Sequence, residues 1–348
     1  MKGEHTYEEI KGQGDAWSLS LKEAENQRHI IDGVIKQSWP EVIFAGCGST
    51  YYLSLSAAAR WQTVTKIRAR GVPGSEAWLY PDSVFAKQPP LLVAISRSGE
   101  TTETKRAIKI YKDRYGLDPV VVSCYSESEM MSETRYPFLA AGGKEQSVAQ
   151  TRSYTSMLIM TQILVAIAAE EDKNIINNMY LLPNAFDKLV SNHESEIKAI
   201  AQEQKFQKFV FLGSGVNYGI ACEATLKMKE MSLSVSEAFH FLEFRHGPKS
   251  MVADDMLIIA LINDSTRNEE LKVLSEMKEY GAAILAIAET GDGIKSDYLI
   301  ELKSGVDVNF RGPLYLPALQ LLAYYRAMEK NLDPDNPTNL STVVELDD

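Results

Sequence analysis

The chain has 348 residues, of which 45% are hydrophobic, and it carries a formal net charge of -11 at pH 7. This length is about twice that of a typical domain, so two domains are expected. The acidic balance argues against sequence-independent binding to nucleic acid or to anionic membranes, since both need clustered lysines and arginines. Cys47, Cys124 and Cys222 show no metal or disulfide spacing, and the N-terminus lacks an apolar signal-like segment. A cytoplasmic protein that acts on small molecules is therefore expected.

Short apolar runs alternate with longer helical patterns along the chain. They are EVIFAG (41–46), LLVAIS (91–96) and PVVVSCY (119–125), followed by KFVFLG (208–213), MLIIALI (256–262) and AAILAIA (282–288). Such alternation predicts parallel sheets covered by helices. The longest apolar stretch, at 156–169, is shorter than the roughly 20 residues that a membrane-spanning helix needs, so a buried core helix is expected there.

The two halves of the chain have the pattern of two copies of one domain, joined by an acidic helix near 186–205. VIFAGCGST aligns with VFLGSGVNY so that Gly46 lies over Gly213. The same offset carries Ser96, after the second strand, to Asn263. A tandem repeat of one α/β domain is therefore predicted. The copies differ after that strand, because SRSGETTET is replaced by NDSTRNEE, without the glycine and most of the hydroxyls.

SRSGETTET lies where a parallel sheet collects its ligands, after a strand and before a helix. Ser96, Ser98 and Thr101 offer hydroxyl donors, and Gly99 lets the backbone approach an oxyanion closely. The alternative is that Ser98 or Thr101 only caps the following helix. A second glycine-and-hydroxyl loop, GCGST at 46–50, favours a phosphate site, since two loops can converge on one anion.

GCGSTY does not fit the dinucleotide-binding fingerprint. Tyr51 replaces its third glycine, and the next strand candidate, KIRARG, ends without the acidic residue that would hold a ribose. No three-ligand cluster suggests zinc, and no G-x-S-x-G elbow suggests a serine hydrolase. Neither a cofactor nor a metal is therefore expected.

The helical stretch IACEATLKMKEMSL carries Glu223, Lys227 and Glu230 at i, i+4 and i+7 on one face. Most of its remaining surface is apolar, so this charged stripe is expected to line a cleft. A solvated salt-bridge face is the alternative. Farther along, His246 stands before Gly-Pro in a loop-like segment, and a side chain that titrates near neutrality there is a candidate acid or base. The remaining histidines are expected to be surface, structural or packed residues: His5, His29, His193 and His240.

Six motifs, in this order, resemble the double sugar-isomerase (SIS) domain family over nearly the whole chain: GCGST, SRSGETTET, SVAQTRSYT, EATLKMKE, SEAFHFLEFRHGP and NPTNLSTVVEL. They resemble above all the isomerase half of glutamine-dependent glucosamine-6-phosphate synthase and the stand-alone aminosugar-phosphate deaminases built like it. The resemblance implies two tandem SIS domains, each a parallel five-stranded sheet flanked by helices in a three-layer, flavodoxin-like α/β arrangement. The expected segments are an N-terminal arm (1–25), the two domains (26–180 and 181–330) and a C-terminal tail (331–348).

The resemblance also implies roles for individual residues. Seven would bind substrate, the first five of them around the sugar phosphate: Thr50, Ser96, Arg97, Ser98, Thr101, Val148 and Gln150. Arg97 stands where the family usually has glutamine. Four would act on the sugar: Glu230 as the proton carrier between C1 and C2, Glu223 and Lys227 as its support, and His246 in ring opening. In the family this histidine is borrowed from a neighbouring subunit, so a homodimer with shared active sites is expected.

Two departures from the synthase change the reaction that is expected. Lys2 follows Met1 where the synthase has a nucleophilic cysteine, so glutamine is not expected to supply the nitrogen. The tail NLSTVVELDD lacks the lysine that forms a Schiff base with fructose 6-phosphate. An isomerising deaminase is therefore expected, acting on glucosamine 6-phosphate or a close relative of either gluco or galacto configuration. A fructosamine-phosphate deglycase, an aldose–ketose isomerase and a non-catalytic sugar-phosphate sensor are the alternatives.

Overall fold

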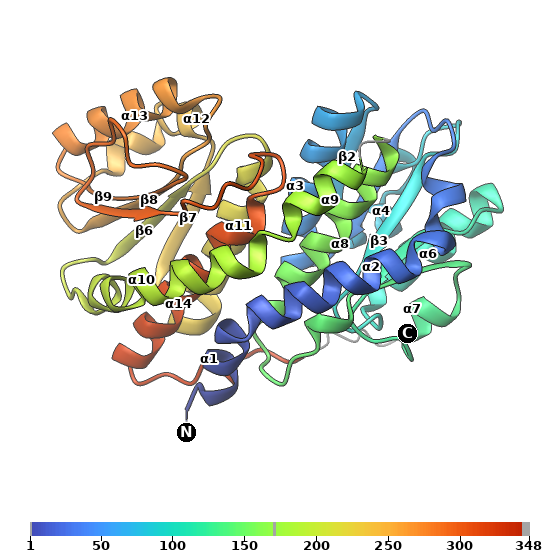
Figure 1. Ribbon diagram of the computed structural model, residues 1–348, viewed down its shortest axis with the longest axis horizontal. Helices are drawn as coiled ribbons and strands as arrows, with labels where there is room; N and C mark the ends of the chain where they lie inside the picture. The colour runs from blue at the N-terminus through green and yellow to red at the C-terminus, as the bar shows by residue number, and fades with distance from the viewer. Residues whose placement is uncertain (1, 170–171, 343–348) are drawn as a thin grey trace. The chain divides into compact units, whose positions relative to one another are not determined.

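The computed structural model describes residues 2–169 and 172–342. Residues 170–171 of the first expected domain and 343–348 of the expected tail lie outside the described residues. The described chain divides into two compact units, both drawn in Figure 1. Unit 1 holds 2–11, 147–149 and 181–340, and unit 2 holds 12–146, 150–169, 172–180 and 341–342. The domain boundaries expected from the sequence stay a prediction.

Unit 2 is built on a parallel five-stranded sheet in the flavodoxin-like order β2-β1-β3-β4-β5. Its strands are β1 (Val42–Gly46), β2 (Ala69–Pro73), β3 (Leu91–Ile95), β4 (Val120–Ser123) and β5 (Tyr136–Leu139). One face packs against α4 (Gly74–Leu79), α5 (Pro81–Val84), α6 (Thr102–Tyr115) and α7 (Glu129–Ser132). The other is covered by α2 (Gln13–Ile35), α3 (Ser49–Thr65) and α8 (Arg152–Ala168). A short helix, η1 (Ala141–Gly143), precedes α8, and α9 (Asp172–Met179) follows it.

Unit 1 repeats this plan, with the sheet order β10-β9-β8-β6-β7. Its strands are β6 (Lys208–Leu212), β7 (Val235–Phe239), β8 (Met256–Leu261), β9 (Ala283–Ala288) and β10 (Tyr298–Glu301). One face packs against α12 (Phe241–Phe244) and α13 (Arg267–Glu279), with η2 (Pro248–Met251) between them in the chain. The other carries α10 (Leu182–Gln202), α11 (Val216–Ser232) and α14 (Leu316–Glu329). The short helix η3 (Gly312–Tyr315) leads into α14, on which α1 (Glu4–Lys11) also packs.

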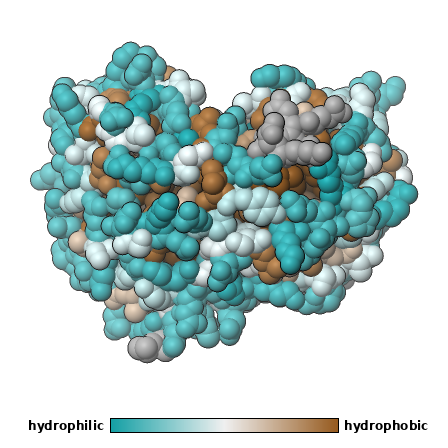
Figure 2. All heavy atoms as spheres, viewed as in Figure 1, coloured by the Kyte–Doolittle hydropathy of each residue, from teal (hydrophilic) through white to brown (hydrophobic). Residues whose placement is uncertain are grey.

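The predicted strands and the predicted core helix are confirmed. β1, β3, β4 and β8 are buried along their whole length, because helices cover both faces of each sheet. Almost every residue of α8 is buried as well, so the apolar stretch at 156–169 belongs to the core of unit 2. In the described part of the chain, no helix combines the length and the apolar character needed to cross a bilayer. Figure 2 shows a largely hydrophilic face with scattered apolar residues.

The repeat is visible in the backbone of the first helix of each copy. α3 and α11 both have 17 residues, and each follows a glycine in nearly the same positive-φ conformation. Gly48 has φ 55° and ψ -123°, and Gly215 has φ 57° and ψ -124°. A side chain would be strained there, which explains why the loops GCGST and GSGVN keep this glycine. The predicted alignment of Gly46 with Gly213 is therefore confirmed for the helix that follows.

The predicted offset is wrong by one residue at the second strand. Ala45 pairs with Ala94, whereas Leu212, its counterpart, pairs with Ala260, which lies one position closer along the chain. Ser96 therefore aligns with Ile262, not with Asn263. The crossover between these strands is one residue shorter in unit 1, and a parallel crossover absorbs such a difference without changing strand register.

All four tryptophans of the chain lie in unit 2: Trp17, Trp39, Trp61 and Trp78. Trp17 and Trp61 are fully buried, and the Trp61 ring meets Phe44 of β1 edge-on with 5.9 Å between ring centroids. The hydrophobic cluster on one face of the unit 1 sheet is built from phenylalanine, valine, leucine, isoleucine, methionine and alanine.

Candidate functional site

The loops predicted to bind phosphate follow two neighbouring strands of unit 2. β1 and β3 pair directly, while β2 lies on the far side of β1, so the order of the sheet reverses between β1 and β3. Ligands of open parallel sheets collect at the carboxyl ends of the strands at such a point. The segments that follow approach each other, because Cys47 Sγ lies 3.6 Å from Thr104 Oγ1. The two loops therefore lie side by side, and their convergence on one anion stays a prediction.

The 96–101 loop turns its hydroxyls toward one another. Ser96 Oγ lies 3.0 Å from Thr101 Oγ1 and accepts the Gly99 N–H at 3.1 Å. Gly99 has φ 69°, and a Cβ there would overlap Ser128 Oγ, so only glycine fits. Thr101 precedes α6 but makes no capping hydrogen bond, and Ser98 Oγ accepts the Glu100 N–H, which lies outside the helix. The helix-cap alternative is therefore wrong for both hydroxyls.

The other predicted substrate ligands have different surroundings. Thr50 Oγ1 accepts the Cys47 N–H at 2.8 Å and donates to Cys47 O at 2.9 Å, so this hydroxyl closes its own loop. Gln150 belongs to unit 2, where its Oε1 accepts a hydrogen bond from Ser153 Oγ at 3.4 Å. Val148 belongs to unit 1, and its N–H donates to Asp335 O at 3.0 Å.

Arg97 is buried beside a carboxylate. Its Nη1 lies 3.3 Å from Glu145 Oε2, and its Nη2 donates to Thr342 O at 2.9 Å. Glu145 in turn accepts the N–H groups of Thr151 at 2.6 Å and Ser153 at 3.0 Å, at the start of α8. Glu145 was not singled out in the sequence, since 48 residues separate it from Arg97 and no local pattern links them.

The charged stripe of α11 lies in unit 1 and is largely buried. The exposed fraction of the side chain is 0% for Glu223, 1% for Lys227 and 18% for Glu230. Lys227 Nζ lies 3.4 Å from Glu223 Oε1 and also donates to Glu230 Oε2. The solvated-face alternative is therefore wrong for Glu223 and Lys227. Glu230 is the most accessible of the three, and its carboxylate lies beside the buried Lys227 ammonium.

The equivalent helix of unit 2 lacks this arrangement. In the alignment that places Gly46 over Gly213, the positions of Glu223, Lys227 and Glu230 correspond to Ser56, Arg60 and Thr63 of α3. The carboxylates thus belong to one copy only, while both copies keep a buried cation at the middle position. The glycine-and-hydroxyl loops thus lie in unit 2, and the carboxylate pair lies in unit 1.

The loop that carries His246 is held from both sides by one carboxylate. His246 is exposed between α12 and η2, and its N–H donates to Glu243 O at 2.9 Å. Arg245 Nε lies 2.7 Å from Glu276 Oε2, and Lys249 Nζ lies 2.7 Å from Glu276 Oε1. The hydrogen bond from Lys249 lowers the pKa of Glu276 below its usual range. Glu276, on α13, was missed in the sequence because nothing there indicates which helix face meets this loop.

His240 and the buried cysteines lack the properties of catalytic groups. The His240 ring stacks on Tyr218 with 3.8 Å between centroids, and burial lowers the pKa of His240. It is a packed histidine, as predicted. Burial raises the pKa of Cys222 to about 11 and also raises that of Cys124, so neither is a reactive thiolate near neutral pH.

In unit 1 the loop that corresponds to the hydroxyl loop already holds a carboxylate. Glu270 of α13 is buried, and it accepts the Asn263 N–H at 2.8 Å and the Thr266 hydroxyl at 2.7 Å. Burial raises the pKa of Glu270. A protein carboxylate therefore takes the donors that an external anion would need, so the site for an anion is expected in unit 2 alone.

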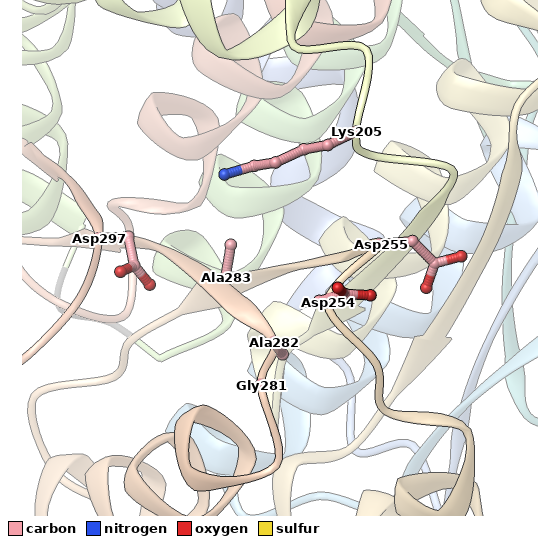
Figure 3. Close-up of a pocket in the computed structure, with 7 residues that line it drawn as sticks. All are labelled: Lys205, Asp254, Asp255, Gly281, Ala282, Ala283 and Asp297. Carbon is pink, nitrogen blue, oxygen red and sulfur yellow. The ribbon is translucent and has the colours of Figure 1, made fainter.

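An open hollow in unit 1, shown in Figure 3, lies away from these groups. It is lined by Lys205, Asp254, Asp255, Gly281, Ala282, Ala283 and Asp297. These residues adjoin the amino ends of β8 and β9, whereas the loops that bind ligands in such folds follow the carboxyl ends of the strands. Asp297 accepts hydrogen bonds from Lys278 and from the Ile284 N–H. Nowhere in residues 2–169 and 172–342 do three or more His, Cys, Asp or Glu side chains form a group that could hold a metal ion.

Comparison with known proteins matches both repeats. The SIS domain model covers residues 37–167 and 203–325. The glutamine–fructose-6-phosphate aminotransferase (isomerizing) of Helicobacter pylori is 30% identical over 331 residues, which make up 91% of this chain and 54% of that protein. The chain thus spans about half the length of the curated relatives it matches.

Two solved structures illustrate the likeness in fold. The C-terminal domain of glucosamine-fructose-6-phosphate aminotransferase from Francisella tularensis has a TM-score of 0.86 at 24% identity, over 95% of this chain and 98% of that one. Glucosamine-6-phosphate deaminase from Thermotoga maritima has a TM-score of 0.72 at 26% identity, over 94% and 99%. Each matched segment of the family model contains all five strands of one parallel sheet, so the chain belongs to the SIS domain family, with two SIS domains in tandem.

Proposed function

We propose that the chain is an isomerising aminosugar-phosphate deaminase that converts glucosamine 6-phosphate and water to fructose 6-phosphate and ammonia. Membership of the SIS family supports an enzyme of phosphosugar isomerisation. The observation that carries the proposal is the buried group of Glu223, Lys227 and Glu230, because an accessible carboxylate beside a buried cation suits proton transfer at carbon. The 26% identical Thermotoga maritima protein, which is a glucosamine-6-phosphate deaminase, supports the choice of substrate.

The phosphate is bound by the hydroxyl loop of unit 2. Ser96, Ser98 and Thr101 supply donors, and the N-terminus of α6 adds a partial positive charge. Thr50 holds the companion loop in shape through both of its bonds to Cys47. Val148 and Gln150 contact the sugar.

Proton transfer is the work of α11. Glu230 takes the proton from C2 of the open-chain aldehyde, which leaves an enolamine between C1 and C2, and returns it to C1. Lys227 holds the Glu230 carboxylate in place, and Glu223 neutralises Lys227 from the buried side. A proton also passes from the amine nitrogen to O1, so the product is a ketimine at C2 with a hydroxyl on C1. Water adds to it and releases ammonia and fructose 6-phosphate, so the atoms balance without a second nitrogen donor.

Ring opening precedes this transfer and is assigned to His246. The histidine is exposed on a loop that Glu276 fixes at both sides, so it can reach a site in a second subunit. A homodimer with shared active sites follows from this assignment. The motif NPTNLSTVVEL has no lysine, so a ketose would lack the covalent attachment that the synthase gives it, whereas an aminosugar needs none.

Ammonia release from a panel of phosphates tests the proposal. Glucosamine 6-phosphate or galactosamine 6-phosphate should release ammonia and form a ketose phosphate, with exchange of the C2 hydrogen for solvent deuterium. Glu230→Gln should abolish both, while Glu279→Gln, an exposed carboxylate of the same unit, should change neither. If fructosamine 6-phosphate releases ammonia and the aminosugar phosphates do not, the protein is a deglycase. Interconversion of aldose and ketose phosphates without ammonia would make it a simple isomerase.

A further inference from the structure

We infer that Arg97 positions the phosphate loop and does not itself bind the phosphate. The inference rests on the proposed function only for the identity of the ligand. The resemblance to the family places Arg97 among the phosphate ligands, at a position where the family usually has glutamine. The contacts of its guanidinium group indicate a different role.

Arg97 joins the phosphate loop to the segment that begins α8. Its side chain is 6% exposed and lies 3.3 Å from Glu145 Oε2, whose side chain is wholly buried. The other oxygen, Glu145 Oε1, accepts the Thr151 and Ser153 N–H groups at the start of α8. On the loop side, Arg97 O accepts hydrogen bonds from the Cys124 N–H and the Ser123 hydroxyl, both at 3.1 Å. The loop, the end of β4 and the N-terminus of α8 therefore form one connected structure.

Unit 1 contains a similar connection with the charges exchanged, one residue farther along the loop than Asn263, which aligns with Arg97. Asp264, in the loop after β8, accepts two bonds from Arg311 Nη1, at 3.0 and 2.9 Å, and Arg311 lies in the segment before α14. In both pairs the arginine is buried and also donates to a backbone carbonyl. Arg97 donates to Thr342 O, and Arg311 donates to Val306 O.

The exchanged pair indicates what the connection is for. The loop of unit 1 lacks the glycine and most of the hydroxyls, and Glu270 occupies its donors, yet the ion pair is present. A phosphate ligand would not be kept in the copy that has no site for phosphate, and it would not be an aspartate. A tie between loop and helix is needed in both copies, and either arrangement of charges provides it. The role of Arg97 is therefore mechanical, and phosphate binding depends on it through the loop.

Removal of the cation leaves the buried Glu145 carboxylate with neutral donors only, namely the Thr151 N–H and hydroxyl and the Ser153 N–H. A broken buried pair is costly, so the loop and the start of α8 are expected to loosen together. Because Ser96, Ser98 and Thr101 remain, the phosphate contacts are weakened but not deleted. The expected signature is a raised KM at nearly unchanged kcat.

The test compares Arg97→Met, Arg97→Lys, Glu145→Gln and the double variant Arg97→Met with Glu145→Gln. Hydrogen exchange of peptides covering 96–101 and 150–155 is measured on the free protein, together with the Kd for inorganic phosphate and with kcat and KM. Asp264→Asn is the matched control, since it breaks the counterpart pair in unit 1. Arg97→Lys keeps the charge, so it should fold even if the methionine variant does not.

The expected result is that Arg97→Met and Glu145→Gln each speed exchange in both peptides and each raise the Kd and KM roughly tenfold, and that the double variant is no worse than either single. Arg97→Lys should recover most of the affinity, and Asp264→Asn should leave the Kd unchanged. The inference is overturned if Glu145→Gln leaves the Kd unchanged while Arg97→Met raises it, or if exchange is unaltered, because Arg97 would then be a direct ligand. If no aminosugar phosphate is turned over, the proposed function fails, but exchange and phosphate binding still decide the role of Arg97.

Discussion

Replacing Lys227 by methionine is expected to destabilise unit 1 more than most single substitutions do. The side chain is 1% exposed, and its ammonium lies 3.4 Å from the wholly buried Glu223 carboxylate and also bonds Glu230. At 3.4 Å and an effective dielectric constant of about 20, the attraction to Glu223 is about 5 kcal/mol. Part of that offsets the cost of burying both charges. Methionine keeps the volume but removes the cation that both carboxylates contact, and a broken buried pair of this kind costs about 3–5 kcal/mol.

Urea unfolding, followed by circular dichroism at 222 nm, measures this loss. Lys229→Met is the matched control, because Lys229 is exposed on the same helix and should change the free energy of unfolding by no more than about 0.5 kcal/mol. Adding Glu223→Gln to Lys227→Met also removes the buried negative charge that Lys227 balances and should recover most of the stability. It should not recover turnover, since Glu230 still lacks its cation. Equal stability of the Lys227 and Lys229 variants would show that the buried pair does not stabilise α11 and would refute the reasoning.

Three further predictions concern the loops and the buried acid of unit 1. Ser98→Ala with Thr101→Ala should raise the KM for the sugar phosphate roughly 10–100-fold and leave the circular dichroism spectrum intact. A hydrogen bond to a charged group contributes about 1.5–3 kcal/mol, and the remaining donors replace part of what is lost. An unchanged KM would place the phosphate elsewhere. His246→Ala and Glu230→Gln should each be inactive, yet an equal mixture should regain about a quarter of wild-type activity, because half the dimers hold one intact site. No recovery, with heterodimers confirmed by native mass spectrometry, would place His246 in the site of its own chain. Burial raises the pKa of Glu270, so ionising it costs the folded protein stability at neutral pH that is regained as the pH falls. Relative to wild type, Glu270→Gln should therefore be most stable near pH 7 and lose that advantage toward about pH 4.5. If the difference in Tm between the variant and wild type is constant across this range, the ionisation of buried Glu270 is not what destabilises the protein.

Local patterns in the sequence were enough to predict the strands, the core helix and the repeat. Each depends on hydrophobic runs and on glycines, which act over a few residues. The burial of Lys227 was also predictable, because the rest of α11 is apolar. The register of the second repeat failed by one residue, since crossover length does not enter the pattern of a strand.

What the sequence could not supply were the contacts between distant segments. Arg97 looks like a basic residue in an anion-binding loop until Glu145 is found beside it. Glu276 is one of several acids on an exposed helix, and only the fold brings Arg245 and Lys249 to it. Such pairs are set by how loops meet at the edge of a sheet, which composition and periodicity do not encode.

The confinement of every tryptophan to unit 2 gives the chain a built-in optical label. Intrinsic fluorescence reports the repeat with the hydroxyl loops, and the fully buried Trp61 contacts β1, the strand that leads into GCGST. Far-ultraviolet circular dichroism reports both repeats, because each has its own helices. Recorded in one thermal scan, the two signals therefore separate the melting of one repeat from that of the whole chain. Variants of α11 should shift the melting curve recorded by dichroism more than the one recorded by tryptophan emission, and variants of the 96–101 loop should shift the emission curve. A destabilising substitution can therefore be assigned to one repeat without an attached dye.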